Sequence, residues 1–465
     1  MAIEGKYMLP SMHRKRKTKQ LGPLLFDNSY LIKLIVPLMG EQFLAVTIGM
    51  ADTIMVSSCG EVAISGVALV DTLSTLFIQL FAAFATGGAA VVNQYLGKKD
   101  ISAANQAARQ LFYICLLLGI ITPAICLPLK APLLKLLYGD LSPELTKACL
   151  TYFVFIFAYF PFLGIFNVGS AIYRSLGNSR LTFKVSILMN ATNILLNALF
   201  IYHFNMGVAG AGLATFISRV VAAAVLLVLI HIQDIPLRLT GLMHVQLDKK
   251  MCLRISSISV PNAIENSAFN IGKLLVQGII SSLGVVAIAS GAVLNNLGSL
   301  ITIPGVGISF ASTTIIGQCV GAGEKDMARY YCKKLQLWGM GAMTIIVLFI
   351  YPLLHIFIGF YHLEADATNL TYGIFSKTLI FFPLFWTSSF SMPNFIRAAG
   401  DAKFTMVVSL ASMMIVRVGC AWLFTLAFGW GLLGVWLAMY CDWIVRSIFF
   451  LQRLHGNKWL EKKVI

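Results

Sequence analysis

Residues 29–56 read SYLIKLIVPLMGEQFLAVTIGMADTIMV, and this stretch decides the class of fold. A helix needs about 20 apolar residues to cross the hydrocarbon core of a bilayer, and this stretch meets that length. It nevertheless contains two carboxylates, Glu41 and Asp52. Ionisable side chains are costly inside a membrane, so each one is a candidate functional residue.

The composition of the whole chain agrees with a membrane protein. Of its 465 residues, 58% are hydrophobic and only 12% are charged, and the mean hydropathy is +0.82. A soluble protein would carry charge on about a quarter of its residues. The net charge of +16 does not indicate a nucleic-acid partner, because the lysines and arginines lie in short connectors and at the termini. The expected partner is the lipid bilayer.

Eleven further stretches of similar length follow, separated by charges or by clusters of glycine, proline and asparagine. The sequence therefore predicts an all-α integral membrane protein of twelve transmembrane helices. The expected spans lie near 29–56, 63–95, 107–129, 148–173, 181–202, 209–232, 255–281, 287–320, 335–359, 370–396, 404–427 and 430–452.

The connectors predict the orientation, since cytoplasmic loops carry an excess of lysine and arginine. Basic residues follow the even-numbered spans, as in Lys98 and Lys99, Arg174 and Arg180, or Lys249 and Lys250. Most of the alternate connectors lack them, although the one between the third and fourth spans does not. Both termini are therefore expected in the cytoplasm, with the protein in the inner (plasma) membrane of the cell.

The sequence also repeats itself at a shift of 224 positions. Residues that match at this shift, or at a shift one residue shorter, include Pro37 and Pro261, Glu41 and Glu265, Gly60 and Gly284, Gln94 and Gln318, Gly207 and Gly431, and Arg174 and Arg397. Two parallel six-helix repeats around a central cavity are expected. The predicted divisions are a basic segment 1–28, a first lobe 29–232, a linker 233–254, a second lobe 255–452 and a tail 453–465.

Short motifs in both halves carry a family resemblance. They are Ala51-Asp52-Thr53, Gln94-x-x-Gly97-x-x-Asp100, Arg174-x-x-Gly177, Gln318-x-x-Gly321 and Arg397-x-x-Gly400-Asp401. With them the chain resembles the multidrug and toxic compound extrusion (MATE) family of bacterial transporters over about residues 25–455. The resemblance implies export of drugs or other organic, often cationic, compounds in exchange for Na⁺ or H⁺, by alternating access. It implies no cofactor, and a monomer is expected.

Eight ionisable residues are expected inside the membrane. They are Glu41, Asp52, Asp71, Glu265, Lys273, Arg417, Asp442 and Arg446. Asp52 follows Glu41 by eleven residues, which places both carboxylates on one helix face. In the fifth span, Asn190, Asn193 and Asn197 form a polar stripe at helical spacing.

The resemblance implies a cation-coupling site in the first lobe at Asp52, Asn193, Asn197 and Thr215, where Na⁺ or a proton would bind. The structural alternative is interhelical hydrogen bonding by the same polar groups. Glu265 resembles an acid of the second lobe in the sodium-coupled branch of the family. A neutralising pair of Glu265 with Lys273 stays open, since their spacing fits imperfectly.

Asp442 and Arg446 are four residues apart, the spacing of an intrahelical ion pair that Arg417 could join from the preceding helix. The sequence favours a structural role for these three residues. Asp71 is expected along the substrate path.

Other classes of protein fit the sequence less well. An enzyme would need a nucleophile with its base, a phosphate loop or a metal cluster, and the sequence contains no such motif. A major-facilitator transporter would carry a different loop after the second span, and a channel does not require two repeats. An exporter of one specific metabolite or of a lipid-linked compound, within the same superfamily, stays open.

Overall fold

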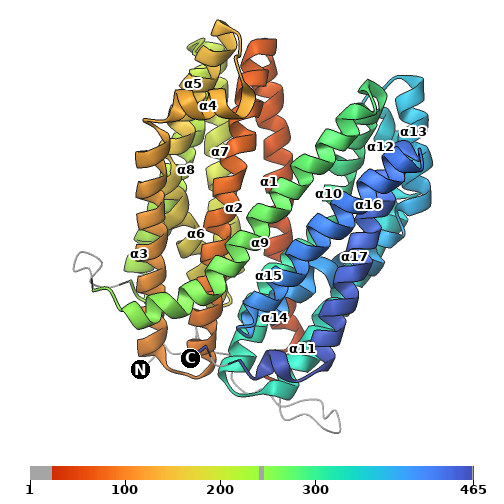
Figure 1. Cartoon of the computed structure of the whole chain (residues 1–465). Helices are drawn as coiled ribbons and strands as arrows, with labels where there is room; N and C mark the ends of the chain where they lie inside the picture. Colours follow the sequence, from red (N-terminus) through yellow and green to blue (C-terminus); the bar gives the residue numbers. More distant parts are fainter. Residues whose placement is uncertain (1–23, 240–245, 463) are drawn as a thin grey trace. The chain divides into compact units, whose positions relative to one another are not determined.

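The computed structural model describes residues 24–239, 246–462 and 464–465. All regular secondary structure in these residues is helical (Figure 1). The chain forms two compact units, one of Asp27–Ser259 and one of Val260–Ile465, with residues 24–26 packed on the second. The basic segment predicted at 1–28 lies outside the described residues except for 24–28.

The first unit contains eight α-helices. They are α1 (Asn28–Ser57), α2 (Glu61–Gly97), α3 (Ile101–Cys126), the short α4 (Lys130–Tyr138), α5 (Pro143–Ala158), α6 (Phe160–Ser175), α7 (Ser179–Asn197) with its π-helical extension η1 (Ala198–His203), and α8 (Gly207–Ile232). Helix α9 (Lys249–Ser282) begins in the first unit and ends in the second.

The second unit continues from α9 with shorter segments. They are α10 (Val285–Gly321), α11 (Lys325–Ile350), α12 (Leu354–Gly359), α13 (Ala365–Thr378), η2 (Phe382–Ser391), α14 (Met392–Ala398), α15 (Ala402–Ala411), η3 (Ser412–Val418), α16 (Gly419–Trp422), η4 (Leu423–Ala427), α17 (Gly431–His455) and the 3₁₀ turn η5 (Lys458–Leu460). Segments η2, η3 and η4 are π-helical.

The predicted twelve spans match these helices. Nine described helices are long and apolar enough to cross a membrane, and two bent pairs raise the number to eleven. The pairs are α5 with α6, bent by 41°, and α13 with the segment Phe382–Ala398, bent by 76°. Proline stands at the start of the second member of each pair, where it cannot donate to the preceding turn. Helix α9 covers the remaining expected span, 255–281, although it does not meet the same test of length and apolarity.

The repeat also appears in the backbone. Gly60 precedes α2 with φ of 99°, and Gly284 precedes α10 with φ of 91°. Only glycine adopts such angles readily. Both positions therefore require glycine, and the shift of 224 aligns these two glycines with each other.

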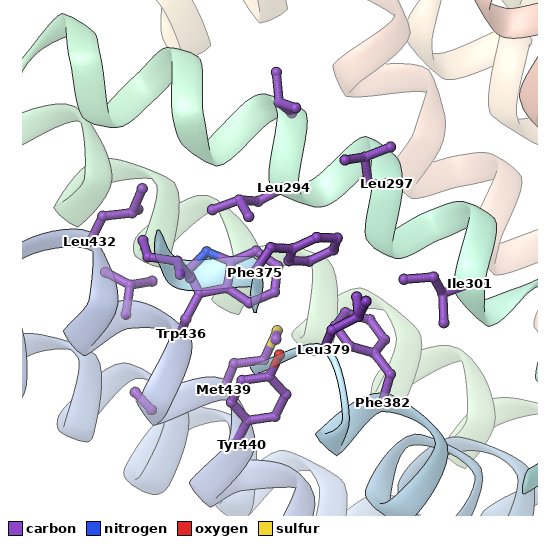
Figure 2. Packing of buried hydrophobic residues seen from close by; sticks show 14 of the residues in the cluster. Leu294, Leu297, Ile301, Phe375, Leu379, Phe382, Leu432, Trp436, Met439 and Tyr440 are labelled. Atoms are coloured by element: carbon purple, nitrogen blue, oxygen red, sulfur yellow. The ribbon is translucent and has the colours of Figure 1, made fainter. Parts of the chain in front are cut away.

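Each unit buries an apolar core of its own. In the second unit, Leu294, Leu297 and Ile301 of α10 lie near Phe375 of α13 and Trp436 of α17 (Figure 2). In the first unit, aromatic rings of α2, α5 and α6 pack together, with 5.4 Å between the ring centroids of Phe77 and Phe157 and 5.5 Å between those of Phe81 and Phe160. Many large apolar side chains outside these cores are exposed, as lipid contact requires.

The described residues between α8 and α9, 233–239 and 246–248, contact α3 of the first unit. Asn105 Nδ2 donates to the Pro236 carbonyl at 3.1 Å, and Gln106 Nε2 donates to Asp248 at 2.7 Å. A Cβ added to Gly87 of α2 would lie 2.7 Å from the Cα of Ser259, so α9 and α2 approach closely. The described part of the predicted linker 233–254 thus belongs to the first unit.

Candidate functional site

Helix α1 presents two carboxylates to α7. Thr182 Oγ1 donates to Glu41 Oε2 at 3.4 Å, and Asn197 Nδ2 donates to Asp52 Oδ1 at 2.7 Å. Both acceptors belong to α1 and both donors to α7. The prediction that Glu41 and Asp52 share a helix face is confirmed.

A proline in α1 helps to fix this alignment. Pro37 has no N–H, which leaves the carbonyl of Lys33 without its usual partner four residues along the helix. The hydroxyl of Ser179, at the start of α7, donates to Lys33 O at 3.2 Å and to Leu34 O at 2.7 Å. The start of α7 is thereby held against α1, and the polar stripe of α7 continues toward Asp52.

The four residues that the resemblance implies for a first-lobe cation site lie together. Asn197 Nδ2, which bonds Asp52, also donates to Asn193 Oδ1 at 3.3 Å, and Asn193 Nδ2 donates to Thr215 Oγ1 at 3.3 Å. Asn193 is 4% exposed and Asn197 is 1% exposed. The Oδ1 atom of Asn197 is buried without a hydrogen-bond partner. A buried acceptor of this kind is costly unless a proton donor or a cation satisfies it.

Two further ionisable side chains belong to the same region of the first unit. Arg219 of α8, one turn after Thr215, interacts electrostatically with Asp52. Its guanidinium lies 3.2 Å from Met189 Sδ, and its Cζ lies 5.7 Å from the centroid of the Tyr159 ring. Asp71 of α2 is exposed and also interacts with Asp52. This polar region thus holds two carboxylates and one guanidinium.

In the second unit, Glu265 pairs with Arg397. Arg397 Nη1 donates to Glu265 Oε2 at 2.6 Å, and Ser409 Oγ donates to Glu265 Oε1 at 2.8 Å. The two charged side chains are 11% and 8% exposed. The partner that the sequence offered, Lys273, lies elsewhere, with its Nζ 5.2 Å from the centroid of the Phe269 ring.

The ion pair predicted within the last span is present. Arg446 Nε donates to Asp442 Oδ1 at 2.9 Å, and Arg417 Nη1 lies 3.9 Å from Asp442 Oδ2. Ser412 Oγ also bonds Asp442 Oδ1, and Arg446 Nη2 donates to the Ser409 carbonyl at 3.1 Å. Through Ser409 this network continues to Glu265.

Sequence reasoning missed three arginines. Arg219 is a charge inside the expected span 209–232, which by itself marks a candidate. Arg397 directly follows the tenth expected span, 370–396, in a connector, yet its long side chain reaches back into the unit to Glu265. Arg174, the residue aligned with Arg397 in the repeat, interacts electrostatically with Glu41. The alignment of both acids and both arginines in the repeat was the available signal.

Comparison with known proteins agrees with this architecture. The family model MatE matches residues 37–199 and again residues 261–423. Both limits of the second match lie 224 positions after those of the first, which is the shift of the internal repeat.

Curated relatives match along nearly the whole chain. "Uncharacterized transporter YisQ" of Bacillus subtilis (strain 168) is 26% identical over 440 residues, covering 93% of this chain and 95% of that protein. "Probable multidrug resistance protein NorM" of Thermotoga maritima is 29% identical over 447 residues, covering 94% of each.

A solved structure has the same fold. It is described as "Outward-facing conformation of a multidrug resistance MATE family transporter of the MOP superfamily" and superposes with a TM-score of 0.85 at 20% identity, covering 92% of this chain and 96% of that one. The family model alone matches well over half of the chain, once in each repeat. The chain therefore belongs to the MATE family, a family of multi-pass membrane transporters rather than enzymes.

Proposed function

We propose that this protein exports small organic compounds in exchange for a cation, Na⁺ or H⁺, which binds at Asp52 in the first unit. The observation that carries the proposal is the connected set of Asp52, Asn197, Asn193 and Thr215. The names of its relatives, which include probable multidrug resistance proteins, support export of small molecules. No cofactor is required for such an exchange, and a monomer in the plasma membrane suffices.

The chemistry of the set suits a small hard cation. Carboxylate, amide and hydroxyl oxygens are the ligands that such ions prefer. Asn197 Oδ1 is available because it has no hydrogen-bond partner. Asp52 supplies the formal negative charge, and it would equally accept a proton. A carboxylate that changes its cation occupancy during transport must have different free energies of interaction in the two access states.

Electrostatic balance gives Arg219 a part in this proposal. A guanidinium close to Asp52 partly neutralises it and competes with the incoming cation. The coupling cation would therefore bind to, and leave, a carboxylate that no direct ion pair among the described residues neutralises. The interaction of Arg219 with Tyr159 and Met189 holds it beside Asp52 without a direct salt bridge among the described residues.

Efflux from proteoliposomes tests the proposal. Ethidium and rhodamine 110 would be loaded separately, and a Na⁺ gradient or a pH gradient would be imposed one at a time. At least one gradient should accelerate efflux of a probe from wild-type vesicles, and Asp52→Asn should abolish that acceleration. Efflux that ignores both gradients, or an Asp52→Asn protein with wild-type coupling, would refute the proposal.

The proposal includes the orientation indicated by the basic connectors, with both termini and the start of α9 in the cytoplasm. A single cysteine placed at Lys249 in a cysteine-free protein should react with a membrane-impermeant maleimide only after the cells are opened. A cysteine placed at exposed Val285, the first residue of α10 and just beyond the far end of α9, is the control and should react from outside. The reverse pattern would contradict the orientation.

A further inference from the structure

Three cationic side chains surround one aromatic ring in the second unit. Lys273 Nζ, Arg446 Cζ and Arg417 Cζ lie 5.2, 5.3 and 5.6 Å from the centroid of Phe269. Lys273 and Phe269 belong to α9, Arg417 to η3 and Arg446 to α17. An aromatic face attracts one cation, but three cations around a single ring also repel one another.

One carboxylate balances this group. Asp442, which is fully buried, bonds Arg446 and Ser412 through its Oδ1 atom. Its Oδ2 atom has no hydrogen bond and lies 3.9 Å from Arg417 Nη1, beyond hydrogen-bond distance. One carboxylate thus faces three cations, with a hydrogen bond to Arg446 and a longer ion pair to Arg417.

Nothing else in the described structure completes the balance. The remaining acid of this network, Glu265, is taken by Arg397. Lys273 forms no ion pair with any described residue, and the buried Nε atom of Arg417 has no hydrogen-bond partner. A buried donor on a charged group is costly when it is left unsatisfied. Lys273 is exposed, so a ligand can reach it directly, whereas the Arg417 side chain beside it is 10% exposed.

The backbone holds this arrangement in place. A Cβ added to Gly272 would lie 2.4 Å from Met413 Cε and 2.6 Å from Met413 Cγ, so α9 and η3 approach closely beside Phe269. Arg417 follows Met413 by four residues within the π-helical segment η3. π-Helical segments occur often at functional sites because they redirect side chains that an α-helix would turn away.

We propose that Lys273 and Arg417 bind an anionic group, a carboxylate or a phosphate, of the transported organic compound. The proposal rests on the export function proposed above and names its substrate class. Guanidinium and ammonium groups make short, strong hydrogen bonds to such oxyanions. An arriving anion would supply the negative charge that the group lacks. Substrates are then organic anions or zwitterions rather than purely cationic compounds.

A matched pair of fluorescent probes tests the proposal on the purified full-length protein. Rhodamine 110 carries a free carboxylate, and rhodamine 123 is its methyl ester, so the two share a cationic ring system and differ in one ionisable group. Binding is followed by fluorescence anisotropy in a neutral detergent. Loss of one charge-assisted hydrogen bond corresponds to a change of roughly tenfold or more in Kd. Wild-type protein should bind rhodamine 110 about tenfold more tightly than rhodamine 123.

Three variants locate the preference. Lys273→Gln should bring the two dissociation constants within about threefold, and Arg417→Gln should do the same if it folds. Lys273 is exposed and forms no ion pair with a described residue, so Lys273→Gln decides the outcome should Arg417→Gln be unstable. Lys403→Gln is the control, because Lys403 is another exposed lysine of the second unit and the substitution removes the same charge. It should leave the preference unchanged.

The outcomes separate this proposal from the export function. Equal affinity of wild-type protein for both probes, or a preference that survives Lys273→Gln, would overturn the anion site even where a gradient drives efflux. A preference that depends on Lys273 but efflux that ignores both gradients would keep the anion site and refute coupled export. Phosphatidylglycerol supplies the lipid control. If it abolished rhodamine 110 binding, and if excess rhodamine 110 could not reverse that loss, the site would belong to a lipid headgroup and the proposal would be overturned.

Discussion

The two repeats of this transporter share one acid, Glu41 in the first and Glu265 in the second. They differ in the charges around their remaining buried or membrane-embedded acids. In the first unit, Asp52 and Asp71 share a polar region with one guanidinium, that of Arg219. In the second unit, Asp442 stands among Arg417, Arg446 and Lys273. One duplicated scaffold therefore holds an acidic region in one half and a basic region in the other. Duplication preserves the helices, while a few substitutions decide which ions each half attracts.

The shared acid shows what the repeats have kept. Glu41 and Glu265 each follow a helical proline by four residues, and each accepts a hydrogen bond from a hydroxyl, that of Thr182 or of Ser409. The aligned arginines lie near the same acids in both units. Glu265 and Arg397 are more deeply buried than Glu41 and Arg174. The same acid and arginine positions therefore interact in both units, in a half-buried setting in the first and a buried one in the second.

The largest effect is expected from Asp52→Asn. The substitution keeps the size of the side chain and removes the charge that we propose attracts the coupling cation. Gradient-driven efflux should fall to the level of protein-free vesicles. The Kd for rhodamine 110, which we propose depends on the second unit, should change by less than about threefold. Efflux and anisotropy on the same preparation check this. Asp71→Asn is the matched control in the first unit. If it abolished gradient-driven efflux as completely as Asp52→Asn does, the coupling role would not be specific to Asp52.

An intermediate effect is expected when Glu265→Gln is compared with Glu41→Gln. Removing one charge of a buried ion pair costs about 3–5 kcal/mol in well-buried cases, because the partner charge stays without compensation. Glu265 is the more buried acid, and Arg397 would join Arg417 and Lys273 as a third cation without a hydrogen-bonded carboxylate. At comparable protein levels, Glu265→Gln should reduce efflux and melting temperature more than Glu41→Gln. Equal losses, or a greater loss from Glu41→Gln, would show that the two pairs have equivalent roles.

The smallest effect is expected at two glycines of α9. An alanine at position 272 would meet Met413, and overpacking of this kind costs about 1–3 kcal/mol. Position 278 has no atom within 4 Å of an added Cβ, and glycine to alanine in a helix gains up to about 1 kcal/mol. Gly272→Ala should lower the melting temperature and weaken rhodamine 110 binding, whereas Gly278→Ala should do neither. Similar behaviour of the two variants would mean that the contact with Met413 does not position Arg417.

The sequence predicted those parts of the structure that depend on periodicity. Apolar length set the twelve spans, and the shift of 224 set the repeat that the family model matches twice. Helical spacing placed Asp52 and Glu41 on one face, and it paired Asp442 with Arg446. Each of these follows from residues on one helix or from a pattern that the chain repeats.

Contacts between distant segments were harder to predict. Arg397 belongs by position to a basic connector, and only folding brings it to Glu265, 132 residues earlier. The position of Lys273 beside Phe269 rather than Glu265 depends on one turn of α9, and the three cations around that ring come from three separate elements. Helical spacing within one segment does not predict contacts between side chains of separate segments. The choice between Na⁺ and H⁺ depends on free energies that neither the spacing nor the contacts give.

The central claim is that the first unit binds the coupling cation and the second unit binds the anionic group of the substrate. Efflux of rhodamine 110 and rhodamine 123 from proteoliposomes, with and without the driving gradient, tests it in wild-type protein, Asp52→Asn and Lys273→Gln. Asp52→Asn should lose the response to the gradient and still bind rhodamine 110 in preference to rhodamine 123. Lys273→Gln should keep the response and export both probes alike. If each substitution removed both properties, or if neither removed the property assigned to it, the division of roles between the two repeats would be contradicted.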